Sequence, residues 1–216
     1  MDTDAHLAAR LATDLDRAFP TLVADHRDRL YTIALRLLGD PRDAEEVAQD
    51  ALVRAYRAIG GYTPQRTAEL RLRPWLASIA VNLARNRRRR HEDRQPPARL
   101  DPLLDGGFDR ADDRAPTGAA LVARREDLAE LAALLLELPP TLRSAVVLRH
   151  VDGLSVAEAA AALGRPEGTI KAQVARGLDR LRARLAATLD ADSAALSVPN
   201  PHVSAGRVFA AAEVLA

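Results

Sequence analysis

The sequence predicts an all-α protein with two helical domains joined by a flexible acidic linker, and with a helix-turn-helix in the C-terminal domain. Hydrophobic residues make up 48% of the 216 residues but aromatic residues only 3%. The cores must therefore be built from Ala, Leu and Val, which favours helices over sheets. Apolar residues recur at helical spacing along most of the chain. That periodicity stops near residue 92, where Pro, Gly and acidic residues accumulate, as is typical of a linker.

These patterns divide the chain into five parts. We expect an N-terminal extension at residues 1–21, a first helical domain at 22–91, a linker at 92–117, a second helical domain at 118–187 and a C-terminal tail at 188–216. The linker carries seven acidic residues against four arginines.

The composition excludes several classes of protein. The formal net charge is +1, so any nucleic-acid binding must come from local patches and not from a global field. There is no cysteine, and the five His residues are scattered, so we expect no disulfide, no metal site and no cofactor. No apolar run is long enough to cross a bilayer, and the acidic start does not resemble a signal peptide. We expect a soluble, cytoplasmic protein without membrane insertion.

Four helices are predicted in the first part of the chain. A weak leading helix at residues 1–19 should end near Pro20, and a buried helix should cover 22–38 before the break at Gly39, Asp40 and Pro41. The third helix is predicted at 43–59. After a loop at 60–67, a long fourth helix should cover 68–91, with Pro74 marking a kink or a later start.

The predicted helix at 43–59 has two unlike faces. One is an apolar stripe, and the opposite face carries Glu46, Gln49, Asp50 and Val53. A Val among acidic and amide side chains indicates a docking surface, although a solvated face with one stray Val explains the pattern equally well.

The predicted helix at 68–91 carries a polar strip beside its core stripe. The strip combines the single Trp of the chain with amides and arginines spaced by three and four residues: Arg71, Trp75, Ser78, Asn82, Asn86 and Arg89. Seven arginines and no acid lie between Arg71 and His91, a local charge of +7 in a protein whose total is +1. A stacking aromatic, amides and phosphate-binding arginines form a set suited to single-stranded nucleic acid. The alternative is that Trp75 belongs to the core and the arginines form a solvated helix end.

The second domain is predicted to contain helices at 119–138 and 141–151, followed by a helix-turn-helix from Gly153 to Gln173. Ser155 and Glu158 can form a capping box at the start of its first helix. Gly164 suits the left-handed conformation that ends this helix, and Pro166 suits the first turn of the next. In this motif the second helix enters the DNA major groove.

The second helix of the motif has one apolar stripe and one basic outer face. The stripe runs from Ile170 to Leu185. Away from it lie Thr169, Ala172, Arg176 and Arg180, with Lys171 on its shoulder, and a basic outer face is what phosphate binding requires. The alternative is an amphipathic helix whose charges only solvate it.

Four segments in this order resemble the sigma factors of the extracytoplasmic-function (ECF) type, the dissociable promoter-recognition subunits of bacterial RNA polymerase. They are DAEEVAQDALVRAYRAI, RPWLASIAVNLARNRRRR, LPPTLRSAVVLRHVDGLS and EGTIKAQ, which begin at Asp43, Arg73, Leu138 and Glu167. The helix-turn-helix segment alone also resembles the output domain of many response regulators, whereas the four together are specific. The resemblance covers roughly residues 22–91 and 120–187.

The resemblance implies a protein that binds core RNA polymerase, recognises the −35 and −10 promoter elements and promotes DNA melting, without being an enzyme. Glu46, Gln49 and Asp50 match the helix that docks on the clamp of the largest subunit, which favours the docking interpretation of the Val53 face. Trp75 and Asn82 match positions that open the −10 element and hold a flipped base, and the loop at 60–70 matches the segment that selects that base.

Further implications concern the second domain and the partners. Lys171 and Arg176 match the −35 recognition helix, but Gln173 stands where the family usually has Arg, which leaves the −35 preference open. The residues expected to bind the −35 element are Thr169, Lys171, Ala172, Gln173, Arg176 and Arg180. Expected partners are promoter DNA, the clamp and the flap of the second-largest polymerase subunit, and an anti-sigma factor.

Two other functions are weighed against this one. A stand-alone helix-turn-helix regulator would leave the Glu46/Gln49/Asp50 face and the Trp75/Asn82 strip unexplained. An enzyme on a helical scaffold is not supported by any His/Asp/Glu cluster, Gly-rich phosphate loop or nucleophile setting.

Overall fold

The computed structural model describes residues 3–94 and 131–196, and all regular secondary structure in these two ranges is helical. The all-α fold class is therefore confirmed. The expected flexibility of the linker, most of the predicted helix at 119–138 and the tail beyond residue 196 lie outside the described residues.

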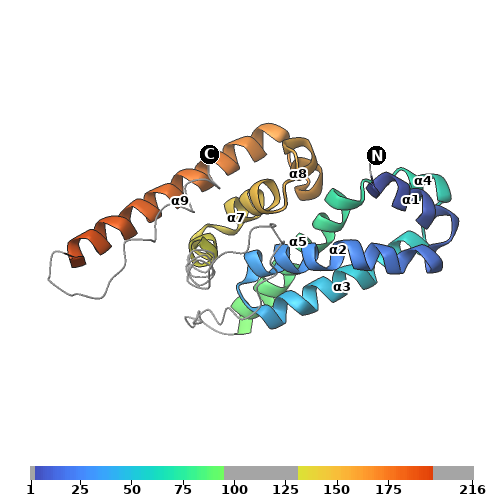
Figure 1. Ribbon diagram of the computed structural model, residues 1–216, viewed down its shortest axis with the longest axis horizontal. Helices are drawn as coiled ribbons and strands as arrows, with labels where there is room; N and C mark the ends of the chain where they lie inside the picture. Colours follow the sequence, from blue (N-terminus) through green and yellow to red (C-terminus); the bar gives the residue numbers. More distant parts are fainter. Residues whose placement is uncertain (1–2, 95–130, 197–216) are drawn as a thin grey trace, which may run out of the picture.

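The N-terminal domain contains five helices: α1 (Thr3–Thr13), α2 (Leu15–Leu38), α3 (Pro41–Gly60), α4 (Pro64–Ala68) and α5 (Leu72–Arg94). The long helices α2, α3 and α5 pack along one another, while α1 and α4 lie together at one end of this bundle (Figure 1). The core between the long helices is made of Leu, Ile, Val and Ala side chains, including the fully buried Leu22, Leu30, Ile33, Leu72 and Leu76.

The first helix break differs from the prediction. Pro20 lies inside α2, and the chain breaks instead at Asp14, whose side chain accepts a hydrogen bond from the backbone N–H of Arg17 at 3.1 Å and caps α2. Pro20 removes one backbone hydrogen bond near the start of α2, and the burial of Ala18 and Leu22 beside it holds the helix together. The expected boundary between residues 21 and 22 consequently falls inside a continuous helix.

The predicted loop at 60–67 contains the short helix α4. Thr63 caps it by accepting from the N–H of Arg66 at 3.3 Å, and Pro64 occupies its first turn. The next helix, α5, begins at Leu72, so Pro74 lies in the first turn of α5, where its missing N–H has little cost. The later start is therefore the correct alternative for Pro74.

The C-terminal domain begins with a helical stretch at 131–137, followed by α7 (Pro140–Val146), a π-helical turn η1 (Val147–Val151), α8 (Val156–Leu163) and α9 (Glu167–Leu196). α7 packs on α9 around Leu142, Val146, Leu178 and Leu181. α9 continues past the predicted end at residue 187 and projects away from the rest of the protein (Figure 1).

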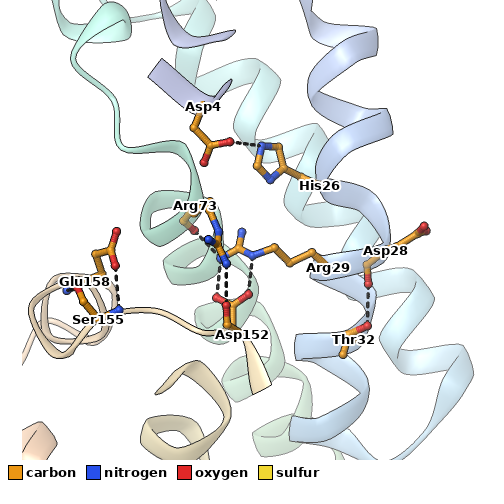
Figure 2. A network of polar contacts seen from close by, with 9 residues as sticks. All are labelled: Asp4, His26, Asp28, Arg29, Thr32, Arg73, Asp152, Ser155 and Glu158. Carbon is orange, nitrogen blue, oxygen red and sulfur yellow. Dashed lines mark hydrogen bonds and ion pairs between the residues drawn. The ribbon is translucent and has the colours of Figure 1, made fainter. Parts of the chain in front are cut away.

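The two domains pack directly against each other, with α5 against α8 and α2 against η1 and α7. Asp152, at the end of η1, has a side chain that is only 1% exposed and forms an ion pair with Arg29 of α2. Arg73 of α5 donates a hydrogen bond to the backbone carbonyl of Asp152 at 2.8 Å. Figure 2 shows Asp152 facing both arginines. On the exposed side, Arg71 pairs with Glu158 of α8 at 2.8 Å.

A second set of contacts joins the end of α2 to the C-terminal domain. The guanidinium of Arg143, on α7, donates to the carbonyl of Leu37 at 2.7 Å and to that of Leu138 at 3.0 Å, and also contacts the carbonyl of Leu136. These carbonyls lie at or just beyond helix C-terminal ends, where acceptors lack helical partners and a positive charge is favourable. Arg143 therefore ties helix ends from both domains to one another.

Gly39 makes the close approach of the domains possible. It ends α2 with a left-handed φ of 82°. A Cβ atom built there would lie 2.5 Å from Cδ1 of Leu136, so a side chain is excluded by the conformation and by the neighbouring domain alike.

Candidate nucleic-acid interface

The polar strip predicted on the 68–91 helix lies along α5. Arg71, Asn82, Asn86 and Arg89 are exposed, whereas Trp75 and Ser78 are half-buried. The hydroxyl of Ser78 donates to the carbonyl of Trp75 at 2.7 Å, and Arg71 is engaged with Glu158. The amides of Asn82 and Asn86 are therefore the strip's exposed groups that can both donate and accept hydrogen bonds.

Trp75 has an aromatic and a cationic neighbour in the segment before α5. The ring of Tyr62 lies 6.2 Å from that of Trp75, centroid to centroid, with the planes tilted by 60°. The guanidinium carbon of Arg66 is 3.9 Å from the centroid of the Tyr62 ring. Both rings are half-buried and pack partly against the apolar core or each other. Trp75 thus packs against the core and remains partly accessible to solvent.

Tyr62 and Arg66 are missing from the predicted strip. The sequence assigned residues 60–67 to a loop, where helical spacing cannot place a side chain beside Trp75. The sequence does contain a signal here, because an aromatic residue, a Pro and an Arg follow a Gly-Gly break within five positions. Aromatic residues are rare in this chain, so one in a short loop indicates a specific contact.

The outer face of α3 carries Glu46, Gln49, Asp50 and Val53, all of which are exposed. Val53 is 47% exposed, and Tyr56, one turn further along, is 40% exposed. The hydroxyl of Tyr56 donates to Asp16 at 2.6 Å, and its ring packs edge-on against Phe19 at 5.0 Å. Tyr56 therefore extends the apolar part of this face in a fixed orientation.

Ion pairs join the outer face of α3 to the C-terminal half of α5. Arg87 contacts Glu46 at 2.5 Å and Asp43 at 2.6 Å, and His91 lies 3.0 Å from Asp43. The hydrogen bond with Glu46 raises the pKa of Arg87 further above its ordinary value, and the bond with Asp43 acts in the same direction. The two surfaces are thus held in a fixed relation, and each pair is partly exposed and individually weak.

The helix-turn-helix has the predicted local structure. Ser155 accepts from the N–H of Glu158 at 3.2 Å, and the Glu158 carboxylate accepts from the N–H of Ser155 at 2.8 Å, which completes the capping box. Gly164 ends α8 with a left-handed φ of 62°. The bonds with Ser155, first the backbone and then the side chain, lower the pKa of Glu158, and Arg71 adds to the effect.

The outer face of α9 agrees with the predicted pattern except at Gln173. Lys171, Ala172, Arg176 and Arg180 are exposed and Thr169 is half-exposed, whereas Gln173 is only 8% exposed. Its amide oxygen accepts a hydrogen bond from Arg165 in the turn at 2.9 Å. Gln173 therefore differs from the other residues expected to bind the −35 element, because its side chain is buried and holds Arg165.

Comparisons with known proteins agree with this architecture. Residues 22–94 match the Sigma-70 region 2 family and residues 128–181 match Sigma-70 region 4. The ECF RNA polymerase sigma factor SigW of Bacillus subtilis is 33% identical over 175 residues, which cover 78% of this chain and 89% of that protein. The chain belongs to the ECF sigma factors.

Two further matches of this ECF sigma factor are a longer relative and a solved structure. The ECF RNA polymerase sigma factor SigE of Mycolicibacterium smegmatis is 34% identical over 178 residues, and the match covers 81% of this chain but 65% of that protein. The solved structure of CnrH in complex with the cytosolic domain of CnrY superposes with a TM-score of 0.63 at 30% identity, covering 86% of this chain and 99% of that one.

The described part of this ECF sigma factor holds no group of three or more His, Cys, Asp or Glu side chains that could bind a metal ion. In the same residues, no helix has the length and apolar character needed to cross a membrane. As a member of this family, the protein is a promoter-recognising subunit of RNA polymerase, and its partners are the core enzyme and promoter DNA.

Proposed function

We propose that the N-terminal domain of this ECF sigma factor holds core polymerase through α3 and the unpaired −10 strand through α5, while α9 reads the −35 element. One observation carries the proposal: exposed amides and arginines on α5 stand beside an exposed acidic and apolar face on α3, and Arg87 ties the two together. Neither surface is needed by a stand-alone DNA-binding regulator.

The proposed −10 surface is the strip of Arg71, Trp75, Ser78, Asn82, Asn86 and Arg89, with Tyr62 and Arg66 beside it. Extracting a base from the duplex costs a few kcal/mol, and a base stacked on an aromatic ring recovers about 1–3 kcal/mol. The tilted pair of Tyr62 and Trp75 supplies that apolar surface, and Asn82 lies two turns along α5 from Trp75 to donate and accept hydrogen bonds.

The proposed −35 surface is the exposed face of α9, formed by Thr169, Lys171, Ala172, Arg176 and Arg180. Its first turns would lie in the major groove, with the arginines further along on the phosphate backbone. Gln173 contributes indirectly, because it holds Arg165 at the turn that precedes α9.

The closed packing of the two domains must open for both elements to be bound at once. Two sites nearly two helical turns apart are separated by about 60 Å, at ~34 Å per turn. The 36 residues from 95 to 130 can span at most about 120 Å at ~3.3 Å per residue. The connection therefore reaches once the contacts around Asp152 and Arg143 are released.

The remaining proposals concern partners and setting. The acidic and apolar face of α3 would dock on the clamp of the largest subunit, and the C-terminal domain on the flap of the second-largest. Because the family usually has one, an anti-sigma factor is an expected partner. We place the action of the protein in the cytoplasm, where polymerase meets the chromosome, and assign it no bond-making chemistry of its own.

In vitro transcription tests the proposal. Purified protein is added to core polymerase and a library of genomic promoter fragments, and we expect new start sites that core enzyme alone does not use. Val53→Arg places a cation on the proposed docking face and should abolish co-elution with core. Ala24→Arg, which alters an exposed position on α2 outside that face, serves as the control. Binding to duplex DNA without co-elution or new start sites would favour a stand-alone regulator.

A further inference from the structure

The helix α1 lies against the segment that carries Tyr62 and Arg66. In the residues that the structure describes, α1 is the main packing partner of α4, and the two helices lie together at one end of the bundle (Figure 1). Leu7, Ala8 and Leu11 of α1 are at most 3% exposed and belong to the same apolar core as the buried leucines of α5. The buried face of α1 is therefore part of the fold, and the −10 surface proposed above includes no residue of α1.

The helix α4 is too short to fix its own position. It has five residues, and a helix of that length is not stable in water unless it packs on another element. Two side-chain hydrogen bonds at α4 are local, namely the cap at Thr63 and a bond from the Thr67 hydroxyl to the Thr63 carbonyl at 3.2 Å. Thr63 and Arg66 are exposed, whereas Thr67 is buried. The position of α4 is therefore set by the helix that it packs on, which is chiefly α1.

The helix α1 is itself attached to the long helix α2. Near the start of α1, the carboxylate of Asp4 lies 3.6 Å from Nε2 of His26 (Figure 2). After the end of α1, Leu15 begins α2 and lies against the Gly-Gly turn before α4, since a Cβ atom built at Gly60 would be 3.7 Å from Cδ2 of Leu15. The helix α1 and its junction with α2 therefore form a fixed support for the residues from 60 to 68.

The position of α4 decides how Tyr62 and Arg66 are presented. Tyr62 directly precedes the cap of α4, and Arg66 belongs to α4 and lies over the Tyr62 ring at 3.9 Å. The same ring is the aromatic neighbour of Trp75. Groups that bind a ligand must be held within about 0.5 Å of the productive geometry, and the residues behind them provide that precision. A change in α1 that moves α4 therefore alters the surface beside Trp75.

We propose that α1 is a positioning element for base selection at the −10 element, with Leu7 and Leu11 as its positioning residues. This role rests on the proposed function, in which Tyr62 and Arg66 lie beside the flipped base. By holding α4, α1 sets the shape of the surface that the base meets. When α1 is loosened, the surface accepts bases that the natural protein rejects, and discrimination between bases falls. The helix α1 acts in this way without contacting the DNA.

The contact between α1 and α4 is tested on the full-length protein without polymerase or DNA, so that the result does not depend on the proposed promoter contacts. Trp75 is the only Trp of the chain, so quenching of its fluorescence by acrylamide reports how well Tyr62 and its other neighbours cover it. Leu11→Ala leaves a cavity beside α1, and we expect it to raise the quenching constant about twofold. Leu7→Ala truncates a second side chain on the same face of α1 and should act in the same direction.

Two variants separate positioning from a general loss of stability. Leu11→Met nearly conserves the volume of the side chain and should keep the natural quenching constant. Leu37→Ala truncates another buried leucine of the same domain, at the end of α2 remote from α1. It should lower Tm as Leu11→Ala does and leave the quenching of Trp75 unchanged. Circular dichroism confirms that each variant is folded.

Base selection is measured with core polymerase on promoters that carry each of the four bases in turn at every −10 position. The quantity compared is the ratio of transcript from the best base to transcript from the next best, which does not change when the amount of folded protein falls. We expect Leu11→Ala to reduce this ratio about fivefold at the selected position, and Leu11→Met and Leu37→Ala to keep it.

Unchanged quenching of Trp75 in both Leu7→Ala and Leu11→Ala would show that α1 does not hold α4, and would overturn this role while leaving the proposed function intact. Raised quenching with an unchanged base ratio would also overturn it, since α4 would then move without affecting selection. An equal loss of the ratio in Leu37→Ala would make the effect one of stability and not of positioning. If the natural protein shows no base preference at any −10 position, the proposed −10 function itself is wrong, and α1 has no selection to control.

Discussion

Asn82 is exposed on α5, and its side-chain amide has room to pair with a base. Replacing it by Ala removes one donor and one acceptor without disturbing the buried face of the helix. If Asn82 holds a flipped base as proposed, its amide meets that base only after strand separation. We therefore expect Asn82→Ala to reduce open-complex formation about tenfold, while closed-complex binding changes less than twofold. Permanganate footprinting of the holoenzyme measures opening, and a gel shift measures closed binding.

The matched control for Asn82 is Gln49→Ala, which removes an exposed amide from α3. Gln49 lies on the proposed docking face and donates to Glu45 at 2.9 Å. Its loss should weaken core binding and leave the extent of melting per bound holoenzyme unchanged. Equal losses of opening and closed binding in Asn82→Ala would contradict the assigned role.

Arg176 is the central cation of the exposed face of α9. Its Nε donates to the carbonyl of Ala172 at 3.1 Å, which holds the side chain along the helix and leaves its terminal nitrogens to the solvent. Arg176→Ala should weaken binding to a −35 duplex about tenfold and reduce the salt dependence of binding by roughly one ion. Fluorescence anisotropy at two salt concentrations measures both effects. Arg184→Ala, which breaks a pair with Glu137, should change neither.

His26 supplies a pH dependence of stability. It is 3% exposed, and burial lowers its pKa below 6.5 although Asp4 lies 3.6 Å away and acts in the opposite direction. The unfolded chain therefore binds a proton near pH 6 that the folded protein does not. Stability is fully present above pH ~6.5 and declines as the pH falls below that value. Urea unfolding at pH 7.5, 6.5 and 5.5 should show this decline, and His26→Gln should flatten it.

At the scale of elements, the start of α8 depends on one reciprocal pair of hydrogen bonds. Ser155→Ala removes the acceptor for the N–H of Glu158 and should destabilise the C-terminal domain by about 1 kcal/mol. Thr188→Ala, whose hydroxyl donates to the carbonyl of Arg184 near the far end of α9, should cost much less. Chemical denaturation of both variants checks the difference, and equal midpoints would show that the cap contributes little.

Elements whose boundaries depend on neighbouring residues could be predicted from the sequence. The capping box at Ser155, the left-handed Gly164 and the start of α3 after Asp40 and Pro41 are each fixed by side chains within four positions. The predicted helix end at Pro20 is wrong because the helix break is set by the N-cap at Asp14, six residues earlier, and not by the proline.

The side chains that the sequence did not place depend on contacts between distant segments. The inward orientation of Gln173 is set by Arg165 across the turn, and Tyr62 reaches Trp75 because α4 folds the intervening chain back. The sequence gives no sign that Arg143 is buried. Its burial results from the packing of helix ends from the two domains around its guanidinium. Helical periodicity carries no information about such meetings.

At the scale of the whole molecule, the closed arrangement depends on a buried ion pair between the domains. Removing one partner of such a pair costs about 3–5 kcal/mol when the other charge stays buried. In the Asp152→Asn variant, the unpaired charge of Arg29 can be hydrated again if the two domains separate. We therefore expect the domains to separate and each domain to stay folded. Small-angle scattering should show a larger radius of gyration for this variant.

The control for Asp152→Asn is Asp179→Asn, which alters a side chain that is 71% exposed on α9. It should leave the scattering profile unchanged. An Asp152→Asn protein as compact as the natural one, with a lower unfolding midpoint, would show that the pair stabilises the fold without controlling the distance between the domains.

Gly39 affects both the end of α2 and the contact between the two domains. A methyl group at this position would strain the chain reversal between α2 and α3 and, in the same step, collide with Leu136. Any substitution at this position therefore destabilises the N-terminal domain and also weakens its packing against the C-terminal domain. The strength of the contact between the domains therefore cannot be changed at residue 39 without also loosening the N-terminal bundle.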